Sequence, residues 1–202
     1  YQDSDAVRVC DFEEDIDLST CALPGAALRG ENLAVWREQI VPLKWGTLEN
    51  TGVYLGWDQE VRPNVARFTL SLSAGELTVG PRSVLRFSLA DAGMPGHGAR
   101  LPSEEIGIDL TLELADRAGH TARLPLSYDM LLQPQLRGRL GKLDWMSALP
   151  MSEPVYQTFE FRLVDFALTN PAFDPAALAE VRFVFDRTLS GVVILDEIAI
   201  RP

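Results

Sequence analysis

Apolar and polar residues alternate along most of this chain, and a period of two residues is the signature of strands that bury one face. The clearest runs are Ala66–Leu72, Leu85–Leu89, Ile106–Leu114, Phe159–Leu163 and Val181–Phe185. Weaker runs are Val7–Phe12, Leu33–Trp36, Val53–Trp57, Ala122–Ser127 and Val192–Ile200. About nine or ten such strands need a second layer to cover their apolar faces, so the pattern predicts an all-β, two-sheet antiparallel β-sandwich of the jelly-roll type.

Turn-forming residues separate these runs and leave little room for helix. Asp116–Gly119 lies between two apolar runs and predicts a hairpin. Asp174 followed by Pro175 predicts a helix of one or two turns, because Asp is a good N-cap and Pro fits the first helical position. The composition does not shift along the chain, which predicts a single domain over residues 1–202.

The net charge of the chain limits its partners. There are 18 basic and 29 acidic residues, which gives a net charge of −11. Nucleic acids and anionic membrane surfaces are bound through basic patches, so this charge argues against both. The longest uninterrupted apolar run, Val192–Leu195, is far too short to span a membrane.

An acidic cluster near the start of the chain lies between the two cysteines, Cys10 and Cys21. Its members are Asp11, Glu13, Glu14, Asp15 and Asp17. The cluster is either a solvated turn or an oxygen-rich site for a hard cation such as calcium. The cysteines either form a disulfide, as in exported proteins, or remain a reduced buried pair. A disulfide predicts an extracellular or periplasmic mature protein.

The last predicted strand contains one carboxylate in an apolar row. The even positions of Val192–Ile200 are all apolar except Asp196. A buried carboxylate has to be paired with a base, hydrogen-bonded to backbone N–H groups or bound to a metal. The strand pattern alone leaves these three alternatives open.

Both ends of the sequence resemble the galactose-binding-like jelly-roll superfamily, which includes many carbohydrate-binding modules. The resemblance is based on Asp11–Glu13, Tyr156–Phe159, Leu163–Phe166, Val181–Asp186 and Gly191 with Ile194–Ile198. It implies that the first and last strands lie side by side and share a structural calcium ion. Placed by position, Glu13 and Asp196 are then the implied carboxylate ligands.

Sugar recognition combines aromatic rings with polar groups that bind hydroxyls. Trp45 and Trp145 are in predicted loops and are the candidate aromatic platform, whereas Trp36 and Trp57 are on predicted strands and are expected in the core. Candidate polar contacts are Tyr54, Tyr128, Arg37 and Asp58. For each of these residues the alternative is an ordinary surface or sheet position.

Catalytic motifs do not stand out in the sequence. The only histidines, His97 and His120, are next to glycines in predicted turns, and no nucleophile elbow, phosphate loop or dinucleotide motif is present. We therefore expect a non-catalytic carbohydrate-binding or accessory module of an exported bacterial protein. The alternatives are a structural β-sandwich that docks on a catalytic domain or partner protein, and a glycan-active enzyme on a jelly-roll scaffold.

Overall fold

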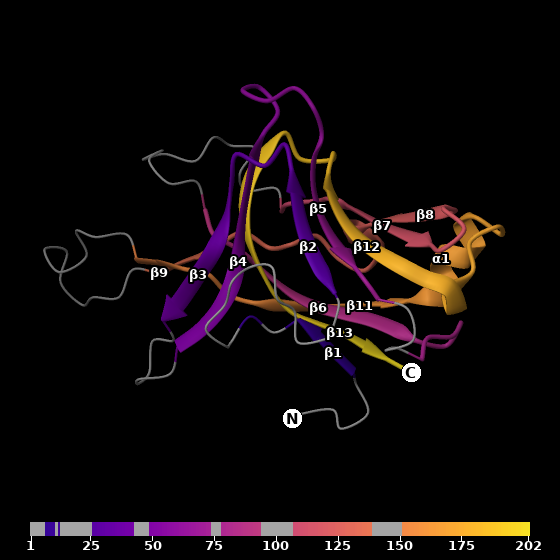
Figure 1. Cartoon of the computed structure of the whole chain (residues 1–202). Coiled ribbons are helices and arrows are strands. Elements are labelled where there is room, and N and C mark those ends of the chain that lie inside the picture. Colours follow the sequence, from indigo (N-terminus) through magenta and orange to yellow (C-terminus); the bar gives the residue numbers. More distant parts are fainter. Residues whose placement is uncertain are drawn as a thin grey trace, which may run out of the picture.

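Two antiparallel sheets form the core of the computed structural model (Figure 1). The structure describes residues 7–10, 12, 26–42, 49–73, 78–93, 107–138 and 151–202. The six-stranded sheet has the order β11-β6-β13-β4-β3, with β1 paired to the far end of β13. The five-stranded sheet has the order β2-β5-β12-β7-β8, and β9 and β10 pair as a separate two-stranded sheet. The predicted all-β sandwich is confirmed.

The bounds of the strands are as follows. The six-stranded sheet contains β1 (Val7–Cys10), β3 (Val35–Pro42), β4 (Glu49–Asp58), β6 (Val84–Asp91), β11 (Gln157–Arg162) and β13 (Ser190–Arg201). The five-stranded sheet contains β2 (Ala27–Glu31), β5 (Ala66–Ser71), β7 (Thr111–Asp116), β8 (Thr121–Pro125) and β12 (Leu178–Phe185). The two-stranded sheet contains β9 (Leu136–Gly138) and β10 (Met151–Glu153). Among the described residues no helix is long and apolar enough to cross a membrane.

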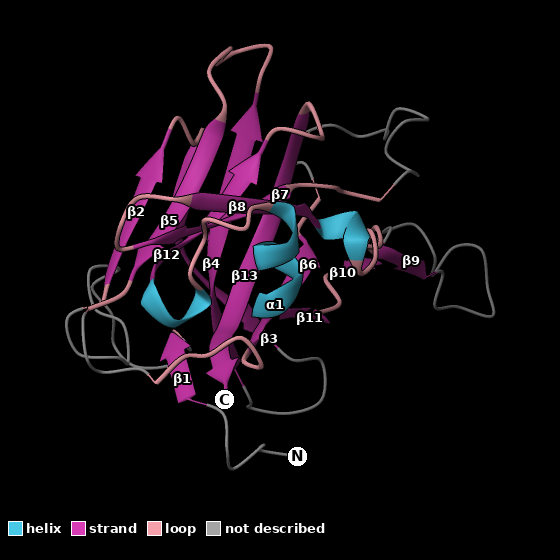
Figure 2. Cartoon of the chain, turned by 90° about the vertical axis from the view of Figure 1, so that its right-hand side faces the viewer, coloured by secondary structure: helices cyan, strands magenta, loops and turns pink. Residues whose placement is uncertain are grey.

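Three short helical segments connect the strands. They are η2 (Leu126–Tyr128), α1 (Leu163–Thr169) and η4 (Pro175–Ala177). The predicted turn at Asp174 is confirmed, since its side chain accepts a hydrogen bond from Ala176 N at 2.9 Å. Figure 2 views the molecule from the side on which α1 lies, and the helix faces the viewer next to β8.

The core lies between the inner faces of the two sheets. Phe87 of β6 stacks on Phe159 and Phe161 of β11, with ring centroids 5.6 and 6.0 Å apart. Phe183 of β12 meets the ring of Phe87 edge-on at 5.1 Å and so joins the two sheets. Edge-to-face and offset rings of this kind add to the free energy of apolar burial.

The first and last strands are neighbours, as the resemblance implies. Val7 of β1 pairs with Ile200 of β13, and Cys10 pairs with Ile198. β13 therefore hydrogen-bonds to β4, β6 and β1, which makes it the central strand of its sheet (Figure 1).

A bulge in β13 corrects the predicted face of the last strand. The register with β6 shifts between Asp196 and Ala199, and Glu197 has a φ of 50°. Val193 and Leu195 precede the bulge in the core, and Ile198 and Ile200 follow it in the same core. Asp196 therefore lies on the outer face with Val192 and Ile194, and the extra residue moves Ile198 and Ile200 to the inner face, so the even positions do not share one face.

Two more predictions about single elements were wrong. Leu163 continues the alternation of Phe159 and Phe161, but it is the first residue of α1. In the described part of the run Ile106–Leu114, which starts at Gly107, the strand begins only at Thr111, and Ile108 makes an isolated bridge with Leu132. Strand β2 was not predicted, because Ala27–Glu31 has a weak alternation of apolar residues.

Candidate functional site

Charged residues cross the outer face of the five-stranded sheet. Register places Arg29, Thr69, Arg182, Glu113 and Arg123 side by side on β2, β5, β12, β7 and β8. Register partners in antiparallel sheets project from the same face. This central row therefore crosses all five strands, a span of about 19 Å at about 4.8 Å per strand.

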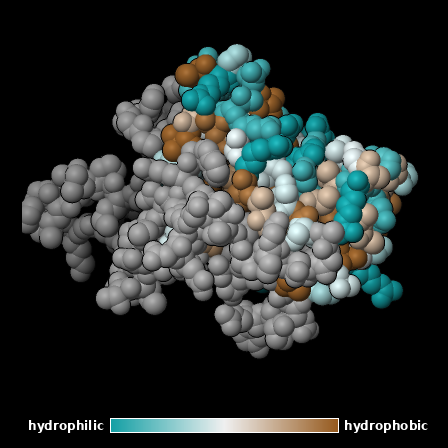
Figure 3. All heavy atoms as spheres, in the orientation of Figure 1, coloured by the Kyte–Doolittle hydropathy of each residue, from teal (hydrophilic) through white to brown (hydrophobic). Residues whose placement is uncertain are grey.

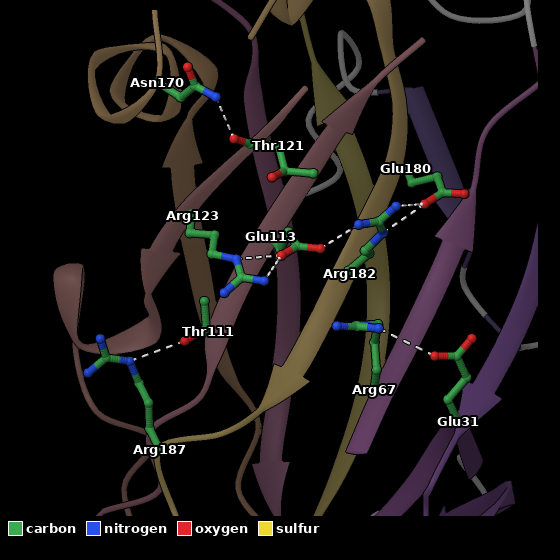
Figure 4. Close-up of polar contacts among 10 residues, drawn as sticks. All are labelled: Glu31, Arg67, Thr111, Glu113, Thr121, Arg123, Asn170, Glu180, Arg182 and Arg187. Atoms are coloured by element: carbon green, nitrogen blue, oxygen red, sulfur yellow. Dashed lines mark hydrogen bonds and ion pairs between the residues drawn. The ribbon is translucent and has the colours of Figure 1, made fainter. Parts of the chain in front are cut away.

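Glu113 is the centre of this row and the most deeply buried of its charged groups. Only 2% of its side chain is exposed. It accepts hydrogen bonds from Arg182 through Oε1 and from Arg123 through Oε2 (Figure 4). Burial by itself would raise the pKa of the Glu113 carboxyl, but the two arginines outweigh it and hold the pKa below the usual value. Glu113 therefore stays ionised and fixes both guanidinium groups.

Further ion pairs extend the network on both sides of Glu113. Arg182 donates from Nε to Glu180 at 2.7 Å, and Glu31 is paired with Arg67 at 3.4 Å and with Arg29 at 3.2 Å. Burial would lower the pKa of Arg182, but Glu113 and Glu180 raise it above the usual value. We call this set the arginine–glutamate lattice; its members are Arg29, Glu31, Arg67, Glu113, Arg123, Glu180 and Arg182.

Two buried polar atoms on this face of β5 have no hydrogen-bond partner within the described part of the structure. They are Thr69 Oγ1 and Arg67 Nε, which lie two residues apart on β5. Thr69 is completely buried. Buried polar groups in proteins are almost always satisfied by protein or water, so Thr69 Oγ1 and Arg67 Nε are exceptions to that rule.

Tyr54, a predicted binding residue, lies on the opposite side of the molecule. It is buried on the outer face of the six-stranded sheet, in a small cluster with Ala90, Val192 and Ile194. Tyr156 packs against this cluster. A Cβ added to Gly52 would lie 2.7 Å from Tyr156 Oη and 2.6 Å from Ile194 Cγ2, so this packing requires a glycine.

The other predicted contact residues are dispersed. Arg37 is the register partner of Tyr54, and its side chain lies outside the described set. Asp58 caps its own turn, since its Oδ1 accepts from Glu60 N at 2.9 Å and from Val61 N at 3.3 Å. Tyr128 is half exposed at the sandwich edge, where its ring stacks on Phe161 at 6.3 Å. Within the described residues the structure does not bring Tyr54, Asp58 and Tyr128 together.

Several predicted residues lie outside the described ranges. These are Glu13, Cys21, Trp45 and Trp145. Of the two tryptophans expected in the core, the side chain of Trp36 is also outside this set, and Trp57 is confirmed as buried. Trp57 stacks on Phe185 at 4.3 Å and donates from Nε1 to Thr188 O at 2.8 Å.

Asp196 and Cys10 are buried where the two chain ends meet. Asp196 Oδ1 accepts a hydrogen bond from Glu197 N at 2.7 Å. The outer-face neighbour Ser88 donates to Glu197 Oε2 at 3.2 Å. Within the described ranges no group of three His, Cys, Asp or Glu side chains converges on a metal position.

His120 belongs to the turn between β7 and β8. Its Nδ1 lies 3.0 Å from Asp116 Oδ2, and Asp116 Oδ1 accepts from His120 N and Ala118 N at 2.9 Å. Burial would raise the pKa of Asp116, but hydrogen bonds from Asp174 N and from the ring and backbone of His120 lower it to about 2. This group of contacts holds the hairpin turn together. His97 lies outside the described residues.

The sequence shows the members of the lattice but not their contacts. Arg67 and Glu113 are recognisable as the polar positions of two alternating runs. The signal that could have found the site is the repeated use of Arg and Glu at outward positions of central strands. The register that brings Glu113 to Arg182, 69 residues away, has no sequence signal.

The two antiparallel sheets form a jelly-roll β-sandwich, and solved carbohydrate-binding modules have a similar fold. One similar structure is the family 30 carbohydrate-binding module of the cellulosomal cellulase Cel9D-Cel44B of Clostridium thermocellum, with a TM-score of 0.53, 12% identity and 96% coverage of each chain. Another is the family 11 module from Clostridium thermocellum in complex with a β-1,3-1,4-mixed-linked tetrasaccharide, with a TM-score of 0.52, 11% identity, and coverage of 97% and 95%.

The same fold also occurs inside a larger enzyme. The chain matches an exo-β-agarase with a TM-score of 0.54 and 13% identity, and it covers 24% of that protein while 96% of this chain is matched. No protein-family model matches the sequence, and neither does any curated protein sequence. At these identities the likeness shows the fold.

Proposed function

We propose that this protein is a non-catalytic carbohydrate-binding module of an exported bacterial protein. The observation that carries the proposal is the correspondence of the whole fold to modules of two families, with 95 to 97% of each chain matched. Those proteins are carbohydrate-binding modules by name, and one was solved with a tetrasaccharide. The agarase match supports the same reading, since there the fold is about a quarter of a polysaccharide-degrading enzyme.

The outer face of the five-stranded sheet is the proposed binding surface. Its side chains are held by mutual ion pairs at Glu113, so a ligand meets guanidinium groups that are already oriented. Pre-organised polar groups lose less conformational entropy when they bind hydroxyls or charged groups. Tyr54 is a weaker candidate, because it is packed inside a cluster with Ile194 and Tyr156.

The mobility of the protein in native gels that contain polysaccharides tests the function. Affinity electrophoresis in gels containing soluble polysaccharides should slow the protein in at least one gel, and Arg123→Ala should restore most of the mobility. Arg82→Ala is the matched control, because Arg82 is an exposed arginine of the turn before β6, outside the lattice. Unchanged mobility in neutral and acidic polysaccharides alike would count against a carbohydrate-binding function.

A second candidate function is docking on a protein partner. Four aliphatic side chains are exposed at the end of the sandwich where loop 59–65 and the turn between β12 and β13 meet; they are Val35, Val61, Val65 and Leu189. Gln59 N donates to Leu189 O at 3.0 Å and holds the two connections together. Brown and teal residues are mixed at this upper end in Figure 3. Val61→Ser with Leu189→Ser should then abolish co-purification with a partner, while polysaccharide binding is retained.

We also propose a structural calcium ion held by Glu13 and Asp196, and a disulfide between Cys10 and Cys21. Asp196 suits a hard cation, because it is a buried carboxylate beside the strand that leads to Glu13. Cys10 is fully buried on the same strand. Mass spectrometry of a non-reduced digest should find the two cysteine peptides joined; separate peptides with free thiols would contradict the disulfide.

A further inference from the structure

We propose that the ligand of the arginine–glutamate lattice is an acidic polysaccharide, one whose sugars carry carboxylate or sulfate groups. This inference depends on the proposed function and narrows it to a substrate class. Three observations support it: the charge of the central row, the exposure of its two end arginines, and the kinds of side chain that surround them.

The central row is positive within an acidic protein. It contains Arg29, Arg182 and Arg123 against the single carboxylate of Glu113, a net charge of +2. The whole lattice has four arginines and three glutamates, so its net charge is +1, whereas the chain has −11. Charges in water are screened over about 8 Å at physiological ionic strength, and the row is about 19 Å long. An anionic chain lying along the row therefore interacts mainly with the lattice, in which the arginines outnumber the glutamates, and the acidic surface beyond the lattice repels it weakly.

The two ends of the row are accessible. The side chains of Arg29 and Arg123 are 64% and 55% exposed, and they stand on the two edge strands β2 and β8. The planar guanidinium fork matches the geometry of two-oxygen anions better than a lysine ammonium does. All the basic residues of the lattice are arginines, as Figure 4 shows for Arg67, Arg123 and Arg182.

The buried centre keeps this arrangement in place. An ion pair on a solvent-facing sheet adds little stability, and burying a carboxylate is costly unless several donors satisfy it. Glu113 is satisfied by two arginines from different strands, so its place in the sheet is better explained by the orientation of Arg182 and Arg123 than by stability.

The surroundings disfavour a neutral glucan. Sugar rings without charge are recognised largely by aromatic side chains. The described outward positions of this sheet hold no aromatic residue; besides the lattice they are Ala27, Ser71, Thr69, Val184, Thr111, Ala115, Thr121 and Pro125. Thr69, Val184, Thr111 and Ala115 are buried, so a ligand meets mainly the side chains of the lattice. The ligand chemistry that this face offers is ionic.

Matched pairs of polymers test the ligand class. Isothermal titration would compare polygalacturonate with its methyl ester, and carrageenan with agarose, with single-stranded DNA as a non-carbohydrate polyanion. We expect one acidic polymer of a pair to bind and its neutral counterpart not to bind; which pair responds tells carboxylate from sulfate. Arg123→Ala and Arg29→Ala should each raise Kd about tenfold, while Arg82→Ala leaves Kd unchanged.

The other outcomes distinguish a failure of the acidic-ligand inference from a failure of the proposed carbohydrate-binding function. Equal binding of neutral and acidic polymers that Arg123→Ala abolishes would overturn the acidic class and leave the carbohydrate-binding function intact. Binding of DNA as tight as that of the acidic polymer would overturn the inference. A loss with Arg82→Ala as large as that with Arg123→Ala would remove the lattice as the site. Absence of binding to all four polysaccharides would overturn the inference, and it would count against the function itself only together with unchanged mobility in the wider set of polysaccharide gels.

Discussion

Thr69 and Thr111 lie on the same outer face of the five-stranded sheet and differ in whether the hydroxyl has a partner. Thr69 Oγ1 is buried without a hydrogen bond within the described structure, whereas Thr111 Oγ1 accepts one from Arg187 Nε at 3.2 Å. Burial of a hydroxyl without a partner costs free energy of desolvation, whereas a hydrogen bond to the buried hydroxyl offsets that cost. The two threonines therefore form a matched pair for measuring what a buried hydroxyl contributes to stability with and without a hydrogen bond.

We expect opposite effects of the two isosteric substitutions. Thr69→Val should raise the free energy of unfolding by about 1 kcal/mol, because it removes an unsatisfied polar group without changing the shape of the side chain. Thr111→Val should lower it by about 1 kcal/mol, because it breaks a hydrogen bond. Urea unfolding of the two variants measures both. A loss of stability in Thr69→Val as large as in Thr111→Val would show that the Thr69 hydroxyl is satisfied.

Single residues also show why the candidate site was hard to predict. Aromatic and polar residues were selected for their chemistry, but the structure buries Tyr54 in a packed cluster and uses Asp58 to cap a turn. Glu113 looks like a solvent-facing strand residue in the sequence, yet two cross-strand arginines cover it. Burial of a polar residue depends on its neighbours in space, which alternation along one strand does not specify.

At the scale of elements, the hairpin of β7 and β8 depends on one carboxylate. Asp116 accepts hydrogen bonds from Ala118 N, His120 N and Asp174 N, and its pKa is lowered to about 2 from 3.8. A group whose pKa is depressed by folding stabilises the folded state when it is ionised. That contribution is fully present above pH 3.8 and is lost as the pH falls towards 2.

Asp116→Asn should therefore change how stability depends on pH. The difference in urea midpoint between the wild type and Asp116→Asn should be constant above about pH 4 and should shrink steadily towards pH 2. Asp186→Asn, at an exposed position after β12, is the control for removing a carboxylate. A difference that stays the same down to pH 2 would mean that the ionised form of Asp116 contributes nothing to the hairpin.

Regular strands were predictable, and interruptions of regularity were not. Alternation located β5, β6 and β12, because every second residue of these strands is an apolar side chain in the core. It missed α1, since Leu163 and Phe166 are buried in a helix as well as they would be in a strand. It also missed the bulge after Asp196, where an inserted residue changes the face without changing the apolar character of the sequence.

At the scale of the whole molecule, β13 pairs with three other strands of the six-stranded sheet: β1, β4 and β6. Residues Ser190 to Leu195 of β13 pair with β4, and residues Ile198 to Ile200 pair with β1. Strands β4 and β1 therefore lie end to end along one side of β13. Strand β1 has only four residues, and its described pairing is with β13 alone. A cross-link or a shared ion at this junction would therefore hold a short terminal strand that has few hydrogen bonds of its own.

The calcium proposal makes a prediction at this scale. If Asp196 and Glu13 hold an ion, millimolar CaCl₂ should raise Tm above the value in EDTA, because a ligand that binds only the folded state stabilises it by about 2.7 kcal/mol at a hundred times its Kd. Asp196→Asn should abolish the shift, whereas Glu60→Gln, which removes an exposed carboxylate of the loop after β4, should keep it. Equal Tm values for the wild type in calcium and in EDTA would contradict the ion. In that case the buried Asp196 carboxylate serves to fix the bulge through its bond from Glu197 N, and the pairing of β1 with β13 alone holds the two ends of the chain together.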